Sequence, residues 1–395
     1  MDPRTNPYAP GAGTPPPELA GRDELIERAA VALDRIRAGR AARSLILYGL
    51  RGVGKTVLLH RIRLDAEARG LISVMIEAPE GRTLPAMLAP TLRAALLRLS
   101  QAEAAKAQGQ RALRALAGFV SALKVRFSDI EVALDFPREP GLADSGDLDM
   151  DLSDLLRAIG EAAASRGTAV VLYIDEIQYV PEEQLAALIT AFHHASQRQL
   201  PVTMVAAGLP QLLGQMGRAK SYAERLFEFA PIDRLDSDAA RDALCLPAEK
   251  EGITYEVSAV SEILVQTQGY PYFLQEWGKH SWDVAVASPI RLEDADQATA
   301  RALADLDASF FRVRFDRLTP AEKSYMRAMA TLGEGPHRSG DIAAALGREV
   351  QSVAPIRSSL IAKGMLYSPA FGDTAFTVPL FDGFMRRIMP RDDAD

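Results

Sequence analysis

The segment Gly49–Thr56 constrains the fold of this chain more than any other feature. It reads Gly-Leu-Arg-Gly-Val-Gly-Lys-Thr, follows the apolar run Leu45–Tyr48 and precedes a helical pattern that begins at Val57. Its three glycines let the main chain turn sharply with several N–H groups pointing inward. A strand, a glycine-rich turn and a helix in this order predict an α/β fold in which helices flank a parallel sheet.

The residue types of this segment fit the binding of a nucleotide phosphate. Lys55 can reach the β and γ phosphates, the Thr56 hydroxyl can coordinate Mg²⁺, and the following helix presents its positive N-terminus to the anion. The alternative is a glycine-rich turn with a helix-capping Thr, which explains neither Lys55 nor the number of glycines. The expected nucleotide-binding residues are Gly49, Leu50, Arg51, Gly52, Val53, Gly54, Lys55, Thr56 and Val57.

A second motif follows the apolar run Ala169–Ile174, which has the composition of a strand buried on both faces. Asp175 stands at its carboxyl end and would hold Mg²⁺ directly or through water, so that Thr56 and Asp175 form the expected metal site. Glu176 would polarise the water that attacks the γ-phosphate, and Lys55 is the second expected catalytic residue. The alternative for Asp175-Glu176 is a solvated turn or a helix N-cap.

Composition bounds the number of domains and the class of protein. A chain of 395 residues with 48% hydrophobic and 25% charged residues predicts two to three globular domains. No apolar stretch reaches the roughly 18 residues of a membrane span, and no basic segment followed by an apolar core opens the chain. We therefore expect a cytoplasmic protein without membrane contact. The single cysteine, Cys245, is expected to be a small buried side chain, and the pair His193-His194 lacks the spacing of a helical zinc site.

The order of patterns along the chain predicts a tail, an α/β domain, a helical lid and a winged helix. Residues 1–17 are rich in Pro and Gly and predict a disordered or surface-lying tail. The α/β domain is expected at 18–235, the lid at 236–309 and the winged helix at 310–395. Strands are expected at 44–49, 71–77, 169–175, 201–207 and 226–230.

An insertion is expected between residues 84 and 150 of the α/β domain. Helices around 84–123 precede two alternating runs, Lys124–Phe127 and Ile130–Leu134, which predict a hairpin. The acidic stretch 141–149 then suggests a solvated linker with a helix cap, because its carboxylates lack the alternating pattern of an EF-hand calcium loop.

The winged helix is expected from three helices and two strands. The helices are Ala321–Leu332, Asp341–Leu346 and a third that is opened by Pro355 and ended by Gly364. The strands are expected at 365–367 and 375–378.

These motifs in this order resemble the AAA+/STAND group of P-loop ATPases, near archaeal origin-recognition initiators and archaeal-type ATPases. The resemblance covers most of the chain from Gly21 on and implies ATP and Mg²⁺ as ligands. It implies that Gly21 and Arg22 pack near the adenine and that Pro271, in Gly269-Tyr270-Pro271, closes over the base. Helix punctuation is the alternative for Gly269 and Pro271.

The resemblance also implies an arginine finger at Arg225, which would stabilise transition-state charge in a neighbouring copy of a homo-oligomer. An ion pair with Glu224 or Asp233 is the alternative. Two departures from the group's pattern put rapid turnover in doubt. The strand ending at Ala206 lacks a polar sensor unless Gln178 substitutes for it, and the lid has no evident sensor arginine.

Two functions follow. The first is a Mg²⁺-dependent ATPase whose ATP or ADP state moves the lid and the winged helix, with duplex DNA as a partner. The net charge is −7, but 12 Lys and Arg against 10 Asp and Glu in 310–395 permit DNA contact there. The basic and polar residues expected to face DNA are His337, Arg338, Arg357, Ser358, Lys363, Arg386 and Arg387.

The alternative function is a slowly hydrolysing STAND-type switch that binds a protein partner, for which Val353, Pro355, Ile356 and Leu360 offer a docking face. A P-loop kinase is a weaker third interpretation, because it leaves the winged helix unexplained. ATP is favoured over GTP because no Asn-Lys-x-Asp element is present.

Overall fold

The computed structural model describes residues 1–390 except 12, 80, 125, 128–129 and 132–135. These residues form two compact units. The first, here called the sheet unit, comprises residues 22–48 and 55–231. The second, called the helical unit, comprises residues 1–21, 49–54 and 232–395. Each unit is described separately.

The sheet unit is built on five parallel strands in the order β2-β5-β6-β1-β7. The strands fall within one or two residues of the expected positions because each is an apolar run bounded by turn residues. All residues of β5 are buried, which explains why its sequence shows no alternation. The strands are β1 (Ser44–Tyr48), β2 (Ile72–Glu77), β5 (Val170–Asp175), β6 (Val202–Gly208) and β7 (Phe227–Pro231).

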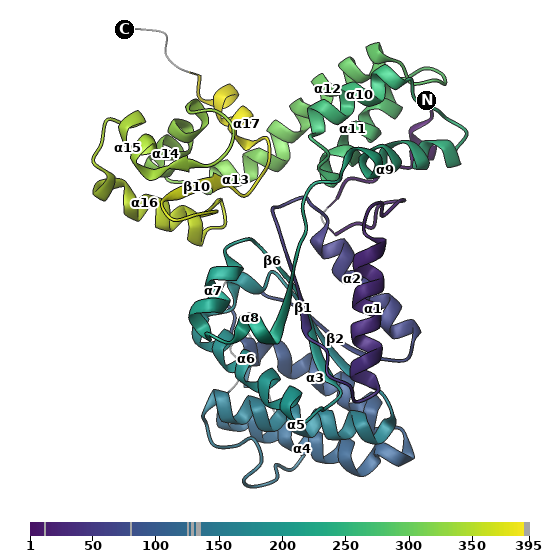
Figure 1. Ribbon diagram of the computed structural model, residues 1–395, viewed down its shortest axis with the longest axis vertical. Helices are drawn as coiled ribbons and strands as arrows, with labels where there is room; N and C mark the ends of the chain where they lie inside the picture. Colours follow the sequence, from purple (N-terminus) through teal and green to yellow (C-terminus); the bar gives the residue numbers. More distant parts are fainter. Residues whose placement is uncertain (12, 80, 125, 128–129, 132–135, 391–395) are drawn as a thin grey trace. The chain divides into compact units, whose positions relative to one another are not determined.

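Helices cover both faces of this sheet (Figure 1). Helices α1 (Asp23–Arg37) and α2 (Lys55–Ala68) pack together on one face. The other face is covered by a second group, in which α4 packs against α3 and α5. The remaining elements of the unit are α3 (Leu84–Ser100), η2 (Glu103–Ala105), α4 (Lys106–Ala122), α5 (Leu148–Arg166), η3 (Ile177–Tyr179), α6 (Glu182–Gln197), α7 (Leu212–Ala219) and α8 (Ala223–Leu226).

The expected hairpin is present as a short antiparallel pair. Strand β3 (Arg126–Phe127) pairs with β4 (Ile130–Glu131). Residue 125 and residues 132–134 of the two predicted runs lie outside the described residues.

The helical unit contains two groups of helices that share one hydrophobic core. The first group is followed directly by a π-helical turn, η4 (Asp307–Phe311), in which Phe311 stacks on Phe384 with ring centroids 5.3 Å apart. The expected boundary at residue 309 therefore falls inside a turn whose side chains join both groups. The first group comprises α9 (Ser237–Lys250), α10 (Val257–Thr267), α11 (Pro271–Val284) and α12 (Leu292–Leu306), and the short helix α13 (Arg312–Asp316) follows η4.

The second group combines helices with a small antiparallel sheet of order β8-β10-β9. Its third helix, α16, starts at Val350, so the prediction that Pro355 opens this helix is wrong. Proline is tolerated inside α16 because the carbonyl it leaves unpaired, that of Gln351, belongs to an exposed residue and can bond to water. The elements are α14 (Pro320–Thr331), β8 (His337–Arg338), α15 (Ser339–Ala345), α16 (Val350–Ala362), β9 (Leu366–Tyr367), β10 (Asp373–Phe376) and α17 (Phe381–Ile388).

The N-terminal segment is ordered on the helical unit and includes the short turn η1 (Pro3–Thr5). Tyr8 is only 4% exposed, and its ring lies against Gly278, where an added Cβ would come within 2.5 Å of a ring carbon. The Tyr8 hydroxyl donates to the carbonyl of Leu244 and accepts from Tyr255 at 3.0 Å. Of the two predictions for residues 1–17, the surface-lying segment is the closer one, but the burial of Tyr8 was not expected from composition.

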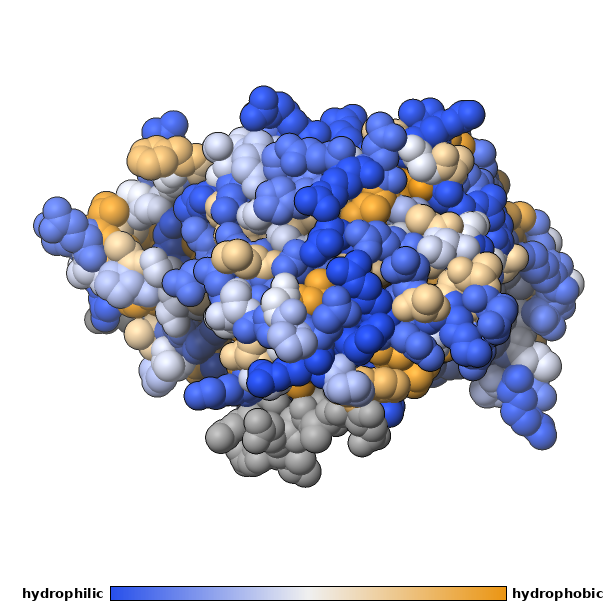
Figure 2. Space-filling view, turned by 90° about the horizontal axis from the view of Figure 1, so that it is seen from below, coloured by the Kyte–Doolittle hydropathy of each residue, from blue (hydrophilic) through white to orange (hydrophobic). Residues whose placement is uncertain are grey.

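The face in Figure 2 is dominated by hydrophilic residues, with hydrophobic ones scattered singly or in small groups. In the described part of the chain, no helix is both long and apolar enough to cross a membrane.

Candidate nucleotide-binding site

The first turn of α2 meets the carboxyl end of β5 in the sheet unit. The Thr56 hydroxyl donates to Oδ2 of Asp175 at 2.7 Å, and the amide of Glu176 donates to Oδ1 at 2.9 Å. Lys55, the first residue of α2, is only 8% exposed although it is a lysine. The structure thus brings together side chains from two motifs that are 119 residues apart in the sequence.

The surroundings of Asp175 suit a divalent cation. Burial raises the pKa of this carboxyl above its ordinary value, and the hydrogen bond from Thr56 opposes that rise only in part. A buried carboxylate beside a hydroxyl supplies the hard oxygen ligands that Mg²⁺ prefers. No group of three or more His, Cys, Asp or Glu that could hold a metal occurs among the residues described. Such a cage is not required, because Mg²⁺ in phosphate-binding sites takes most of its ligands from phosphate and water.

Glu176 has an unusual main-chain conformation. Its φ of +51° places it in the left-handed region, which non-glycine residues seldom occupy. The residue follows β5 and is the N-cap of the turn η3, and its carboxylate accepts a hydrogen bond from Nε2 of Gln178. This conformation turns the Glu176 side chain out of the alternation of the strand.

Glycine is required in the loop 49–54 for two separate reasons. Gly52 and Gly54 have φ values of +82° and +89°, which strain any other residue. Gly49 has no such φ, but an added Cβ would lie 1.9 Å from the carbonyl oxygen of Ile232. The loop sequence is therefore fixed by main-chain geometry at two positions and by close packing at a third.

The loop is held within the helical unit by main-chain hydrogen bonds. The amide of Tyr272 donates to the carbonyl of Gly52 at 3.1 Å, and the amide of Arg51 donates to the carbonyl of Thr377 at 3.0 Å. Neither Tyr272 nor Thr377 was predicted from the sequence. The only signal for Tyr272 was its place directly after Pro271.

The residues expected near the base have clear structural roles. Pro271 is the first residue of α11. Gly269 has a φ of +73°, and an added Cβ there would lie only 2.7 Å from the carbonyl oxygen of Leu235. The helix-punctuation alternative thus accounts for both residues. Gly21 packs equally closely, because a Cβ there would lie 2.8 Å from that of Ala239. Arg22 is the N-cap residue of α1. Contact of Gly21, Arg22 or Pro271 with adenine stays a prediction.

Arg225 is exposed on α8. An exposed guanidinium suits both an arginine finger and a surface ion pair. The structure therefore leaves the arginine-finger prediction open.

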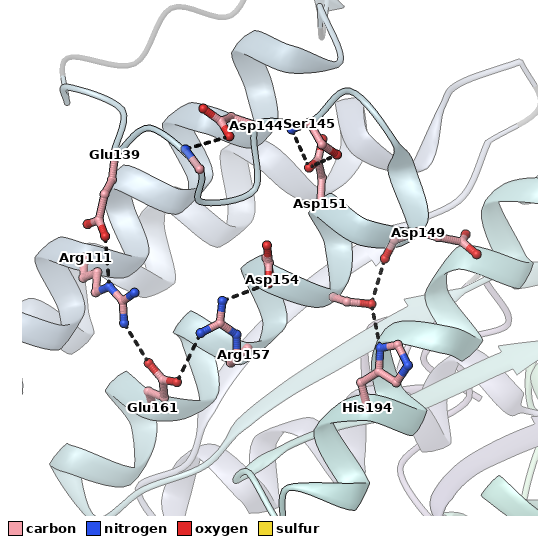
Figure 3. Close-up of polar contacts among 12 residues, drawn as sticks. Arg111, Glu139, Asp144, Ser145, Asp149, Asp151, Asp154, Arg157, Glu161 and His194 are labelled. Carbon is pink, nitrogen blue, oxygen red and sulfur yellow. Dashed lines mark hydrogen bonds and ion pairs between the residues drawn. The ribbon is translucent and has the colours of Figure 1, made fainter.

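The acidic stretch 141–149 forms a helix cap (Figure 3). Asp147 caps α5 by accepting from the amide of Met150 at 2.9 Å, and the buried Asp151 accepts from Ser145 and Gly146. Nearby carboxylates pair with arginine, as Glu161 does with Arg111 and Arg157 and Glu139 does with Arg111. The helix cap was expected from the sequence, whereas the burial of Asp151 and the ion pairs of Glu161 within the protein were not.

Cys245 is half-buried and not fully buried as expected, and burial raises the pKa of its thiol to about 11. A thiol with so high a pKa is a poor nucleophile near neutral pH. His193 packs on the ring of Tyr222 with centroids 4.7 Å apart, and His194 contacts Ser153.

Most of the basic residues expected to face DNA are engaged within the helical unit. Arg357 donates to Thr374, Ser368 and the carbonyl of Asp373. Lys363 pairs with the buried Glu322 at 2.7 Å. Two further arginines behave alike: Arg386 donates to the carbonyl of Ala330, and Arg387 pairs with Asp307. Arg338 and Ser358 are exposed, whereas Val353 and Leu360 of the alternative docking face are core residues.

Comparison with known proteins agrees with this geometry. Residues 18–205 match the family described as AAA ATPase domain, and residues 308–385 match a domain of unknown function (DUF8462). The chain is similar in fold to the Walker-type ATPase of Pyrococcus abyssi, with 16% identity, a TM-score of 0.60 and coverage of 94% of this chain and 97% of that chain. The parallel sheet flanked by helices and followed by a mainly helical region is therefore a P-loop ATPase fold.

Two further solved structures are less similar in fold. They are Orc1 of Aeropyrum pernix in complex with DNA, with 17% identity, 94% coverage of both chains and a TM-score of 0.47, and RuvB of Thermotoga maritima, with 16% identity, 90% and 92% coverage and a TM-score of 0.45. A search of curated proteins gives no match.

Proposed function

We propose that the protein hydrolyses ATP to ADP and phosphate in a Mg²⁺-dependent reaction, a proposal supported by the match of residues 18–205 to the family described as AAA ATPase domain. The observation that carries this proposal is the 2.7 Å hydrogen bond between Thr56 and Asp175, beside the nearly buried Lys55. A Thr that only capped a helix and an Asp that only faced solvent would have no reason to lie within hydrogen-bonding distance. Two ligands of one cation, in contrast, must be neighbours.

In this proposal each residue of the site has a separate chemical role. Lys55 and the amides of residues 52–57 neutralise the triphosphate at the start of α2. Thr56 and Asp175 would hold Mg²⁺, which when bound offsets charge on the phosphate oxygens. Glu176 accepts the proton of the attacking water, because its carboxylate adjoins the cation site without being used as a ligand.

The proposed switch connects this reaction to the helical unit. The main-chain amides of a P-loop bind the phosphates, and two residues of this loop, Arg51 and Gly52, bond to Thr377 and Tyr272 within the helical unit. We expect a change of nucleotide to alter these main-chain bonds and so to shift α11 and the elements around β10. In this proposal the second helical group acts as a winged helix, with α16 as its third helix and the β9–β10 hairpin as its wing.

A protein partner is favoured over duplex DNA. Non-specific DNA binding needs free cations, and Arg357, Lys363, Arg386 and Arg387 are already paired within the unit. The wing tip offers the exposed Phe371 and no basic residue between positions 368 and 373. We therefore propose the STAND-type switch with a protein partner as the second candidate function and leave DNA to the test below.

The reaction is tested with two variants and matched controls. Lys55→Ala should abolish or strongly weaken ATP binding in calorimetry, and Glu176→Gln should retain binding while slowing turnover by about 10²- to 10⁴-fold. The controls are Lys106→Ala and Glu183→Gln, exposed residues that receive the same substitutions. An Lys55→Ala protein with unchanged affinity, or wild-type turnover of Glu176→Gln, would contradict the assignments.

The partner is tested by retention on duplex DNA at increasing salt. Phosphate contacts weaken steeply as salt rises, so strong retention at low salt that is lost at moderate salt would favour DNA. Absence of retention at low salt, with ATP binding intact, is the result expected here.

A further inference from the structure

Gln178 is a buried amide with two specific partners. It lies two residues after Glu176 in the turn η3 and is 5% exposed. Its Oε1 accepts from the main-chain amide of Leu209 at 3.0 Å, and its Nε2 donates to the carboxylate of Glu176. Its own main-chain carbonyl accepts from Nε2 of Gln215 at 3.3 Å. The side chain thus spans from Glu176, after β5, to the end of the neighbouring strand β6.

The orientation of this amide is fixed by chemistry. The N–H of Leu209 can only donate, so it must face the oxygen of the amide and not the NH₂ group. The opposite orientation would set two donors against each other at Leu209 and two acceptors against each other at Glu176. Nε2 is therefore an obligate donor toward Glu176.

The end of β6 is shaped to admit this side chain. At Gly208 an added Cβ would lie 2.8 Å from Oε1 of Gln178 and 2.9 Å from Leu212. The φ of Gly208 is not positive, so its need for glycine comes from packing and not from main-chain strain. Gly208 also pairs with Tyr48 at the end of β1, just before the loop 49–54. The space for Gln178 is thus defined at the same edge of the sheet where Asp175 ends β5.

We propose that Gln178 is a positioning residue that directs the carboxylate of Glu176 from a fixed point on β6. This inference rests on the proposed ATPase activity. A general base must be held in a narrow range of directions. Glu176 has a left-handed main-chain conformation and lies between a strand and a short turn. β6 ends in Ala206-Ala207-Gly208, which carry no polar side chain, and Gln178 supplies the polar group at that end from the neighbouring connection.

A positioning role for Gln178 differs from a structural role in whether its effect on hydrolysis depends on the residue at position 176. If Gln178 acts through Glu176, its removal matters only while position 176 carries the carboxylate. A residue that merely supports the fold would weaken nucleotide binding and stability, and its effect would add to that of any change at Glu176.

The experiment is a double-mutant cycle of Gln178→Ala and Glu176→Gln, read by single-turnover ATP hydrolysis and by ATP binding. We expect Gln178→Ala to slow hydrolysis by about 10²-fold with ATP affinity within about threefold of wild type. In the Glu176→Gln background the same change should slow the residual hydrolysis less than about twofold. Equal losses in both backgrounds, or no loss in the wild-type background, would overturn the proposal.

A second cycle keeps the test valid if Gln178→Ala folds poorly. Gly208→Ala retains both residues, Gln178 and Glu176, but its Cβ would displace the side-chain amide of Gln178. It should therefore also slow hydrolysis while preserving ATP affinity. In the Glu176→Gln background it should slow the residual hydrolysis less than about twofold, because the carboxylate that Gln178 directs is absent. Gly208→Ala with full activity contradicts the proposal.

Failure of the inference can be told apart from failure of the proposed function. If Glu176→Gln blocks hydrolysis and Gln178→Ala does not, only the inference is overturned. If the wild-type protein shows no Lys55-dependent hydrolysis, both are overturned.

Discussion

The sheet unit and the helical unit hold their functional residues in different ways. In the sheet unit the contacts run between side chains, as in the hydrogen bond of Thr56 with Asp175 and that of Gln178 with Glu176. In the helical unit the loop residues Arg51 and Gly52 are held by main-chain bonds to Thr377 and Tyr272. Side-chain contacts require particular residue types, whereas main-chain contacts require only that the chain be packed in the right place. Substitutions in the first unit should therefore alter chemistry, and substitutions in the second should alter stability.

The largest expected effect is at Arg225 in the sheet unit. If this exposed residue acts as an arginine finger on a neighbouring copy, Arg225→Ala should slow ATP hydrolysis by about 10³-fold or more without lowering the thermal unfolding temperature. The measurement is turnover of mixtures of Arg225→Ala with Lys55→Ala protein, since each variant could supply what the other lacks. Arg218→Ala, an exposed arginine on α7 paired with Glu182, is the control. Unchanged turnover of Arg225→Ala under conditions of proven assembly would exclude the finger.

The next effect in size belongs to the helical unit and concerns Tyr8. Loss of this buried ring in Tyr8→Ala should lower the free energy of unfolding by about 3 kcal/mol. Gly278→Ala should cost about 1–3 kcal/mol, because its Cβ would collide with the ring. In the Tyr8→Ala background Gly278→Ala should be neutral or stabilising by up to about 1 kcal/mol, because alanine favours a helix over glycine. Denaturant titrations measure all four proteins, and additive losses would show that the ring and Gly278 do not interact.

Thr56 offers a sharper test of the side-chain contact. Thr56→Ala should weaken Mg²⁺-dependent ATP binding by about 10- to 100-fold, because it removes one metal ligand and leaves Oδ2 of the buried Asp175 without its donor. Thr56→Ser retains the hydroxyl and should retain binding. Calorimetric titrations with Mg²⁺ and with EDTA distinguish a lost metal ligand from general damage, which would weaken binding equally in both.

The smallest expected effect is a pH dependence of the helical unit that comes from Glu322. Burial tends to raise the pKa of this carboxyl, but hydrogen bonds from Lys363, Thr319 and Ser359 outweigh burial and lower the pKa to about 2, from an ordinary 4.5. Because the folded pKa is depressed, the stabilisation is complete above about pH 4.5 and is lost as the pH falls toward about 2. Its size is on the order of 2 kcal/mol, allowing for the partial exposure of Lys363.

The check is denaturant unfolding of wild type and Glu322→Gln at about pH 5 and about pH 3. Wild type should lose more stability between the two conditions than Glu322→Gln does. Glu334→Gln, an exposed change in the same region, should behave as wild type. Equal pH dependence of wild type and Glu322→Gln would exclude the network of Glu322 as its source.

The contrast between the units also explains what could be predicted from the sequence. The strands of the sheet unit were predicted because burial on both faces demands apolar runs such as that of β5. Lys55, Thr56, Asp175 and Glu176 were identified because their chemistry depends on residue type, and the structure joins Thr56 to Asp175. Gln178 was noticed as a possible sensor, but its partner Leu209 donates through the main chain and leaves no mark in the sequence.

Contacts in the helical unit were harder to predict from the sequence, because the partner of a residue leaves no mark near that residue. Gly278 reads as an unfavourable residue within a helix, and only the position of Tyr8, about 270 residues earlier, explains it. The start of α16 was misplaced because proline commonly opens a helix, whereas Pro355 lies inside α16 where the freed carbonyl can reach solvent. Arg357 and Lys363 were read as DNA contacts because basic residues on a helix show their charge in the sequence but not their partners.

The path of the main chain through the two units limits how the protein can be dissected. The chain passes from one unit to the other four times, at residues 21–22, 48–49, 54–55 and 231–232. No single cut therefore yields either unit whole. A fragment that stops at residue 231 would keep the loop 49–54 and Tyr8 but lose Tyr272, Thr377 and Gly278, to which they are fastened. A recombinant fragment of residues 1–231 would thus carry residues 1–21 and 49–54 of the helical unit without the residues that hold them, and its behaviour would say little about the intact molecule.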